Sequence, residues 1–425
     1  MSTFVIEGGR AIAGEHRVSG NKNAALPMIA ASLLTAGKVK LLNIPDIADV
    51  VAMLEAARRF GAEVRRDGDT VEIATPKLKA STISPELAAR IRTSILFAGP
   101  LLARAGKASL PPPGGDQIGH RRLDTHFAAF RQLGAKAQAG KKMLRFEGAL
   151  KGARILLDEA SVTATENVLM ASVLAKGKTV IYNAACEPHI VDLANMLNLM
   201  GAKVAGAGTN RIEVEGVEAL DGCEATVGCD YIEAASYVTA AAVTGGTLAL
   251  TNIDPAPFEI LAPTFARFGV TWVIDAKART LIYQPKKKLK MKYDLGDAIP
   301  SVADGPWPAF PSDLISMLVV LATQTRGTCL FFEKMFESRL YFVDHLRGLG
   351  AKIVQCDPHR VVVTGPSALY GGRVTSPDIR AGIALVIAAL AAKGKSVIQN
   401  AETVDRGYVA VEKELSALGG SIVRR

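Results

Sequence analysis

Three basic residues lie where helix formation alone does not explain a charged side chain. Lys22, Arg92 and Arg380 each stand where the chain enters an alanine-rich segment of helical pattern. A positive charge at a helix start opposes the helix dipole, so an anionic ligand explains these side chains better. Ammonium and guanidinium groups bind phosphate and carboxylate well. The pattern therefore predicts a site for a phosphorylated or carboxylated small molecule.

The other polar residues at these helix starts have a simpler explanation. They are Asn23, Ser161, Thr163, Thr165, Asp230, Ser312, Asp313 and Asp378. Ser, Thr, Asp and Asn are common N-caps, and for Ser161 and Ser312 taken alone capping is the preferred interpretation.

A loop rich in Pro and Gly is a second candidate for chemistry. It begins at Pro111 and runs through Asp116 and Arg121 to His126. A surface loop of this composition with several charged residue types is typical of a lid over a site, although an ordinary polar loop remains an alternative. A shorter polar segment, Asp405–Tyr408, occupies the corresponding place near the C-terminus.

A sixfold repeat organises these residues. A phrase of large apolar residue, Gly, small residue, polar residue and apolar residue recurs, with its glycines at 61, 134, 201, 269, 350 and 419. A helical pattern precedes each Gly, which suits a left-handed C-cap, and alternating strands follow it. Upstream lie an alanine-rich helix and another strand. The sequence predicts six βαβαββ units, three in each of two domains. If the six units are arranged with pseudo-symmetry, their helix starts converge on one region.

Bulk properties limit the remaining possibilities. A length of 425 residues favours two domains, and 49% hydrophobic with 21% charged residues is typical of a globular protein. No segment has the pattern of a signal peptide or membrane span, so we expect a cytoplasmic protein without membrane partners. The five cysteines and six histidines show no metal-ligand spacing, and no metal is expected. The run Lys286–Lys292 is interpreted as a solvated segment, not a nucleic-acid surface, within a net charge of +9.

Five motifs match one known family. They are Gly20–Pro27, Gly114–Asp124, Pro308–Asp313, Asp378–Ala381 and Asp405–Tyr408. In their order and spacing the chain resembles the UDP-N-acetylglucosamine 1-carboxyvinyltransferases from Phe4 to the C-terminus. Five separate motifs are much more specific than one glycine-rich match.

The resemblance implies a fold and an activity. The fold class is α/β, with two inverse α/β barrel domains of three βαβαββ units each. One barrel is expected to comprise residues 1–21 and 230–425, and the other residues 22–229 with the loop 111–124. The implied reaction transfers the enolpyruvyl group of phosphoenolpyruvate to the 3-hydroxyl of UDP-N-acetylglucosamine and releases phosphate. This is the first committed step of peptidoglycan synthesis and uses no cofactor. The oligomeric state is left open.

Roles for individual residues also come from the resemblance. The residues implied to bind phosphoenolpyruvate are Lys22, Arg92, Arg121, Arg406, Asp378 and Arg380. Those implied to bind the UDP-sugar are Asn23, Arg92, Arg121, Arg122, Leu123, Asp124, His126, Ser161, Val162, Thr163, Asp313 and Met335. Lys22, Asp116 and Asp313 are the implied catalytic residues, and Asp313 takes the proton of the sugar hydroxyl.

The sequence departs from the family's commonest pattern at four positions. Asp116 stands where Cys is common, Arg122 where Pro is common, His189 where Glu is common and Tyr231 where Arg is common. The family's Cys protonates the methylene carbon of phosphoenolpyruvate and is alkylated by the epoxide fosfomycin. A carboxylic acid can donate this proton if its pKa is raised, but it reacts poorly with the epoxide, so we expect fosfomycin insensitivity. Tyr231 is equally compatible with plain packing.

Other functions remain as alternatives. Enolpyruvyl transfer to shikimate 3-phosphate is one, although the chain has Asn-Lys-Asn at 21–23 where that sister family has a Ser-Lys-Ser type. Transfer to another uridine nucleotide is a second. A catalytically silent binding protein is a third, but such a protein has no need of a proton-abstracting Asp313.

Overall fold

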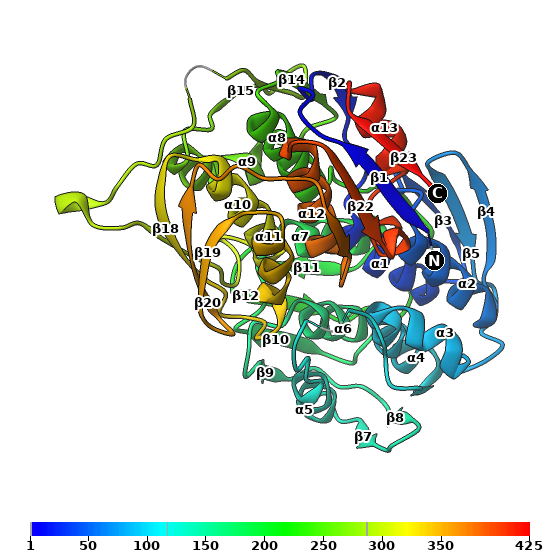
Figure 1. Cartoon of the computed structure of the whole chain (residues 1–425). Helices are drawn as coiled ribbons and strands as arrows, with labels where there is room; N and C mark the ends of the chain where they lie inside the picture. Colours follow the sequence, from blue (N-terminus) through cyan, green and yellow to red (C-terminus); the bar gives the residue numbers. More distant parts are fainter. Residues whose placement is uncertain (1, 117, 286–287) are drawn as a thin grey trace. The chain divides into compact units, whose positions relative to one another are not determined.

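The computed structural model describes residues 2–116, 118–285 and 288–425, so the first two lysines of the Lys286–Lys292 run lie outside the described residues (Figure 1). The chain divides into two compact units. Unit 1 comprises Met1–Ser19, Gln117–His120 and Cys229–Arg425, and unit 2 comprises Gly20–Asp116 and Arg121–Gly228. Within the described ranges, none of the helices combines the length and apolar character that a membrane crossing requires.

Unit 1 is built on three four-stranded sheets. Their orders are β15-β16-β14-β2, β17-β18-β20-β19 and β21-β22-β1-β23. The strands are β1 (Thr3–Glu7), β2 (Gly14–Arg17), β14 (Leu248–Thr251), β15 (Trp272–Asp275), β16 (Thr280–Tyr283), β17 (Ser301–Ala303), β18 (Gly327–Phe332), β19 (Lys352–Asp357), β20 (Arg360–Gly365), β21 (Arg373–Thr375), β22 (Lys395–Gln399) and β23 (Ser421–Arg424). Because β1 pairs antiparallel with both β22 and β23, the N-terminal strand completes the last sheet.

Unit 2 contains two four-stranded sheets and one three-stranded sheet. Their orders are β13-β3-β5-β4, β11-β12-β10-β9 and β6-β8-β7. The strands are β3 (Lys38–Leu42), β4 (Glu63–Asp67), β5 (Thr70–Ala74), β6 (Lys107–Leu110), β7 (Lys136–Ala139), β8 (Leu144–Glu147), β9 (Arg154–Leu156), β10 (Lys178–Tyr182), β11 (Lys203–Ala205), β12 (Arg211–Glu215) and β13 (Glu224–Thr226). Each four-stranded sheet of the chain has one parallel pair followed by two antiparallel pairs, as a βαβαββ repeat requires.

The predicted alanine-rich helices are confirmed as the buried helices of the two units. In unit 1 they are α8 (Tyr231–Thr244), α10 (Ser312–Gln324) and α12 (Ile379–Ala391), which pack against one another in pairs. In unit 2 they are α1 (Lys22–Ala31) with η1 (Ser32–Leu34), η2 (Arg92–Phe97) with α4 (Ala98–Ala105), and α6 (Val162–Ser172). Nearly every residue of α8 and α12 is buried. Small side chains let such helices approach closely at interior packing density.

The remaining helices lie between the second and third strands of each βαβαββ repeat or in connections. They are α2 (Ala48–Arg59), α3 (Pro85–Arg90), α5 (Asp124–Gln132), α7 (Pro188–Leu199), α9 (Pro255–Arg267), η3 (Leu295–Asp297), η4 (Arg339–Phe342), α11 (Val343–Gly348), η5 (Ala401–Arg406) and α13 (Val411–Ala417). Each repeated Gly follows the C-cap of one of these helices and has a left-handed φ, for example 106° at Gly61 and 91° at Gly419. The predicted C-cap role of the repeat's glycines is therefore confirmed.

Candidate active site

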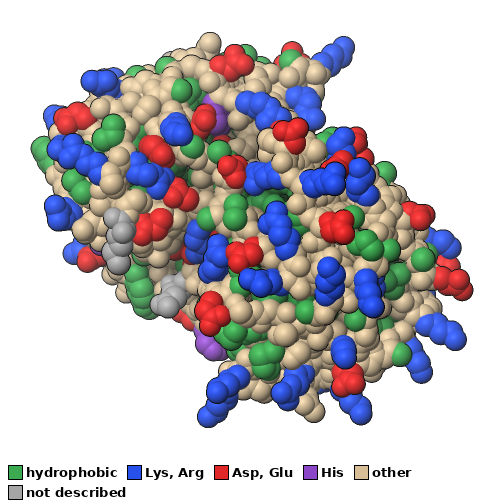
Figure 2. Space-filling view, turned by 90° about the vertical axis from the view of Figure 1, so that its right-hand side faces the viewer, with side chains coloured by type: hydrophobic (Ala, Val, Ile, Leu, Met, Phe, Trp, Pro, Cys, Tyr) green, Lys and Arg blue, Asp and Glu red, His purple; other side chains and the backbone are tan. Residues whose placement is uncertain are grey.

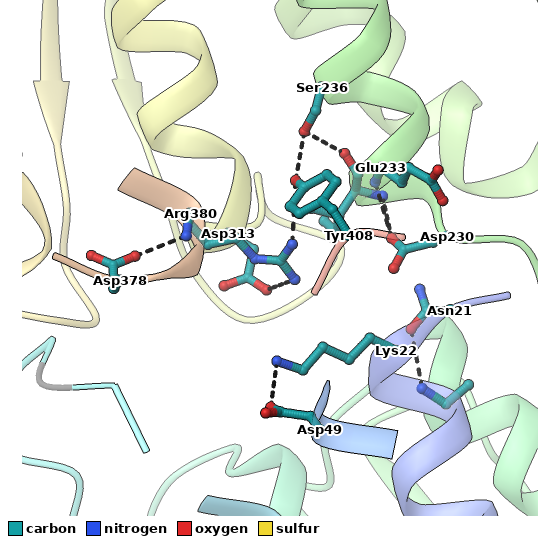
Figure 3. Close-up of polar contacts among 12 residues, drawn as sticks. Asn21, Lys22, Asp49, Asp230, Glu233, Ser236, Asp313, Asp378, Arg380 and Tyr408 are labelled. Atoms are coloured by element: carbon teal, nitrogen blue, oxygen red, sulfur yellow. Dashed lines mark hydrogen bonds and ion pairs between the residues drawn. The ribbon is translucent and has the colours of Figure 1, made fainter. Parts of the chain in front are cut away.

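Unit 1 holds a carboxylate between two guanidinium groups. Asp313 is the second residue of α10, and its Oδ2 lies 2.8 Å from Nη2 of Arg380 (Figure 3). Its Oδ1 lies 3.2 Å from Nη2 of Arg339. The two arginine side chains are 6% and 3% exposed, whereas the Asp313 side chain is 27% exposed. The ion pairs thus fix the carboxylate while a ligand can still reach it.

Arg380 links the three buried helices of unit 1. The carboxylate of Asp378 caps α12 and accepts hydrogen bonds from the backbone N–H groups of Arg380 (2.8 Å) and Ala381 (3.0 Å). Nη1 of Arg380 lies 3.4 Å from the hydroxyl of Tyr408, which in turn bonds Ser236 of α8 at 2.9 Å. Burial by itself lowers the pKa of Arg380, but the charge of Asp313 raises it above its ordinary value. Arg380 is therefore a permanent cation.

The segment that carries Arg406 is fixed by ion pairs behind it. Arg406 is the half-buried last residue of η5. Asp405, the residue before it, accepts a hydrogen bond from Nη1 of Arg424 at 2.8 Å, and Nη2 of Arg424 also lies 3.0 Å from Glu412. These contacts hold η5 against the last strand, so that the position of Arg406 follows from β23.

In unit 2 a lysine lies buried at the start of α1. Asn21 caps this helix, and its side chain accepts a hydrogen bond from the backbone N–H of Ala24 at 3.0 Å. Nζ of Lys22 lies 2.7 Å from Oδ2 of Asp49, at the start of α2 (Figure 3). Both side chains are buried, so the pair is pre-organised in one geometry. Asn23, the next residue of the helix, is half-buried.

The glycine-rich loop packs on a second cation of unit 2, Arg92. A Cβ on Gly114 would lie 1.9 Å from the carbonyl oxygen of Ala89, and one on Gly115 would lie 2.9 Å from Cβ of Arg92. Asp116, half-buried, follows directly. The guanidinium of Arg92 donates hydrogen bonds to the backbone carbonyls of Arg121 and, at 3.3 Å, Arg122.

Positive charge is crowded around Arg92. Burial and the nearby charge of Arg121 lower the pKa of Arg92 to about 10, so it stays protonated at neutral pH. A bound anion would relieve the repulsion between these two cations and favour their charged forms. The arrangement therefore suits a phosphate or carboxylate.

His126 links the start of α6 to the interior of unit 2. Its Nε2 lies 3.1 Å from the hydroxyl of Thr163, and its Nδ1 lies 3.1 Å from Nδ2 of Asn167. Since the Asn167 amide is a donor, Nδ1 accepts and Nε2 carries the proton. Burial, with the charge of Arg92, lowers the pKa of His126 to about 3. His126 is thus a neutral residue that holds Thr163.

The remaining residues of the predicted UDP-sugar set are more exposed. Arg122 and Asp124 form an exposed ion pair, with Nε of Arg122 2.8 Å from Oδ2 of Asp124. Leu123 is the N-cap residue of α5, and Val162 begins α6. Met335, in the turn after β18, is 38% exposed.

Capping accounts for Ser161 but not for Ser312. The Ser161 hydroxyl accepts a hydrogen bond from the backbone N–H of Ala164 at 3.4 Å, as predicted. The N-cap of α10 is Pro311, and Ser312 lies inside the helix, where its hydroxyl donates to Oε1 of Glu333 at 2.8 Å. The capping interpretation of Ser312 is therefore wrong, because a buried carboxyl group is a better partner for the hydroxyl.

Three residues of the site escaped the sequence analysis. Asp49, Arg339 and Glu333 contact Lys22, Asp313 and Ser312 respectively, over sequence separations that no local pattern reveals. Two positions that depart from the family pattern are buried. Tyr231 packs its ring 5.6 Å from Trp307, and His189 is 3% exposed. Among the described residues, no group of three or more His, Cys, Asp or Glu side chains is placed to hold a metal ion.

Comparison with known proteins first defines the class. The family model of EPSP synthase (3-phosphoshikimate 1-carboxyvinyltransferase) matches residues 6–415. The fold is that of the enolpyruvyl transferase NikO from Streptomyces tendae, with a TM-score of 0.88 over 100% of this chain and 98% of that one, at 23% identity. The predicted fold class, two inverse α/β barrel domains of repeated βαβαββ units, is confirmed, and the protein is an enzyme of the enolpyruvyl transferase class.

Full-length relatives then define the family. A UDP-N-acetylglucosamine 1-carboxyvinyltransferase of Treponema pallidum is 50% identical, covering 99% of this chain and 98% of the relative. One of Treponema denticola is 48% identical over 99% of both chains. This chain belongs to the UDP-N-acetylglucosamine 1-carboxyvinyltransferase family, and the predicted membership is confirmed.

Proposed function

We propose that this chain transfers the enolpyruvyl group of phosphoenolpyruvate to the 3-hydroxyl of UDP-N-acetylglucosamine, in the cytoplasm, as the committing step of peptidoglycan synthesis. Family membership supports the reaction. The observation that carries the residue assignment is the Asp313 carboxylate, which two buried guanidiniums orient while its own side chain stays partly exposed. A pure binding site has no use for an oriented base of this kind.

The proposed chemistry has two stages. Asp313 accepts the proton of the 3-hydroxyl while that oxygen bonds to C2 of phosphoenolpyruvate, and an acid protonates the methylene carbon C3. In the second stage C3 loses a proton, the C2=C3 double bond re-forms, and the bond from C2 to the phosphate oxygen breaks. Phosphate leaves with its bonding electron pair, so charge is balanced by protons alone.

We assign phosphoenolpyruvate to Lys22, Arg92, Arg121 and Arg406. The crowded charge around Arg92 and the buried position of Lys22 support this assignment, because both groups gain from a fixed anion. We assign to Asp116 the role of the acid that protonates C3. The two glycines before Asp116 pack against the segment that carries Arg92 and so place Asp116 beside it. The remaining predicted contacts to the UDP-sugar, from Asn23, Asp124, Ser161 and their neighbours, stay proposals.

We also propose the domain limits expected from the sequence, 1–21 with 230–425 and 22–229. The assignment of Met1–Ser19 and Cys229–Arg425 to one compact unit supports them.

The test is phosphate release from phosphoenolpyruvate by the purified protein. Parallel reactions contain UDP-N-acetylglucosamine, shikimate 3-phosphate or no acceptor. Release with the nucleotide sugar alone is the expected result. Release with the shikimate ester alone would contradict the proposed acceptor and favour the activity for which the matching family model is named. Release with neither would favour a catalytically silent binding protein.

A further inference from the structure

Four of the six βαβαββ repeats share a side-chain hydrogen bond, called the clamp below, at the end of one strand. Directly after β3, β10, β14 and β22 stands an asparagine with φ between 56° and 62°. Its amide donates to the backbone carbonyl that follows the parallel neighbour strand, at 2.8 to 3.0 Å. The pairs are Asn43 with Val227, Asn183 with Leu157, Asn252 with Val18, and Asn400 with Ser376.

A fifth repeat, the one that contains β18, has a glutamate at this position. The backbone N–H of Asp304 bonds the carbonyl of Phe332 at 3.3 Å, just as Val18 bonds Thr251 at 3.1 Å, so that Glu333 is equivalent to Asn252. Glu333 does not have the left-handed φ of the four asparagines. A carboxyl group has no amide hydrogens with which to form the common clamp. The clamp has been replaced here by a different set of contacts.

The new contacts lead to the candidate base. The Glu333 carboxyl is fully buried and accepts hydrogen bonds from the Ser312 hydroxyl, at 2.8 Å, and from the backbone N–H of Phe336, at 3.1 Å. Its Oε2 also lies 3.8 Å from Nε of Arg339. Ser312 precedes Asp313, and Arg339 is bonded to Asp313. Glu333 therefore contacts the residue before Asp313 and one of the two arginines that hold the Asp313 carboxylate.

The start of α10 needs such a support. The other buried helices of unit 1 are capped by the carboxylates of Asp230 and Asp378. The N-cap of α10 is Pro311, whose side chain cannot accept a hydrogen bond. The contact from Glu333 to Ser312 anchors the first turn of this helix in place of a cap.

We infer that Glu333 is a positioning residue for the reaction, fixing the Asp313 carboxylate through Ser312 and Arg339. The inference rests on the proposed function, in which Asp313 is the base. A misplacement of a catalytic group by about 1 Å can reduce a rate by roughly 10²-fold, so that loss of this support affects turnover before it affects folding.

The protonation state of Glu333 suggests a conservative variant. Burial, together with the neighbouring carboxyl of Asp304, raises the pKa of Glu333 above its ordinary value and favours its neutral form. Glutamine has the same charge as this neutral form and nearly the same shape. Glu333→Gln retains an acceptor for Ser312 and Phe336, whereas Glu333→Asn is shorter by one methylene and matches the residue type of the other repeats.

The experiment measures kcat, the KM of each substrate and the melting temperature of these two variants. We expect Glu333→Asn to fold and to lose about 10- to 100-fold in kcat. Its KM for phosphoenolpyruvate should stay within about twofold of wild type, because no cation assigned to that substrate contacts Glu333. Glu333→Gln should retain kcat within about threefold. Asn252→Ala, which removes the asparagine clamp of another repeat in unit 1, should lower the melting temperature and leave kcat unchanged.

Three results would overturn the inference. The first is a folded Glu333→Asn variant with wild-type kcat. The second is a loss of kcat in Glu333→Gln equal to that in Glu333→Asn. The third is a loss of kcat in Asn252→Ala as large as that in Glu333→Asn. Failure of the proposed function is recognised separately, because the wild-type enzyme would then release no phosphate with UDP-N-acetylglucosamine.

Discussion

Replacing Asp313 by asparagine removes one negative charge with little change in volume. General base catalysis contributes roughly 10²- to 10⁴-fold, and a factor of ten corresponds to about 1.36 kcal/mol. We therefore expect Asp313→Asn to lose about 3 to 5 kcal/mol of transition-state stabilisation. The residual rate should then be at most about one hundredth of the wild-type kcat.

The same substitution should also destabilise unit 1. The carboxylate is 2.8 Å from Arg380 and 3.2 Å from Arg339, and asparagine can accept from one of them only while its amide hydrogens face the other. Leaving a fully buried partner charge unpaired costs about 3 to 5 kcal/mol. Because the Asp313 side chain is 27% exposed, water screens part of this cost, and we expect about 1 to 3 kcal/mol. For a domain of roughly 150 to 250 residues this lowers the melting temperature by several degrees.

The assay is phosphate release at saturating substrates, with differential scanning fluorimetry on the same samples. Asp254→Asn is a matched control, since Asp254 caps α9 in the same unit and asparagine caps equally well. The control should retain kcat and melting temperature. If Asp313→Asn keeps more than about a tenth of wild-type kcat, Asp313 is not the base. If it loses activity without any loss of stability, the two arginines do not depend on the carboxylate as described.

Three further predictions concern unit 2. The wild-type enzyme should be insensitive to fosfomycin, whereas fosfomycin should inactivate Asp116→Cys and leave one covalent adduct that mass spectrometry detects. An adduct on Asp116 of the wild-type enzyme would contradict this prediction. The pKa of His126 is lowered to about 3, so its contribution to stability is complete above about pH 6.5 and is lost as the pH falls towards 3. His126→Gln should flatten that dependence of urea unfolding, and an unchanged slope would refute the assignment. The exposed pair of Arg122 with Asp124 should contribute little to stability, because water screens it. Arg122→Ala should therefore unfold at nearly the wild-type urea concentration, and a clear shift of the midpoint would show a buried role.

The repeat is the part of the fold that the sequence reveals most directly. Each repeated Gly marks a helix end, because a left-handed C-cap strongly favours glycine, and Gly61 and Gly419 have that conformation. The alanine-rich segments could be recognised as buried helices for a similar reason, since only small residues allow close helix packing. Local chemistry determines both features, so a single sequence is enough to predict them.

The partners of the site residues could not be predicted in the same way. Arg339 lies 26 positions from Asp313 in the sequence, and Asp49 lies 27 positions from Lys22. Neither separation matches the period of a helix or a strand, so no sequence pattern predicts these pairs. Ser312 shows the same limit from the other side. Its type and position predicted a cap, and its actual partner is a buried carboxyl group that only the folded sheet brings near.

Departures from the repeat locate function better than the repeat itself. At the end of the strand that each unit shares, four units have the clamping asparagine, and these four have a purely structural hydrogen bond. The other two strands are β18, followed by Glu333 beside the proposed base, and β6, followed by Pro111, which opens the loop of the proposed acid. Neither exception has the clamping amide, and a departure of this kind persists when something else is gained. In a chain built from copies of one unit, the other copies thus serve as the structural reference. The positions where one copy abandons a shared contact are the first candidates for catalysis.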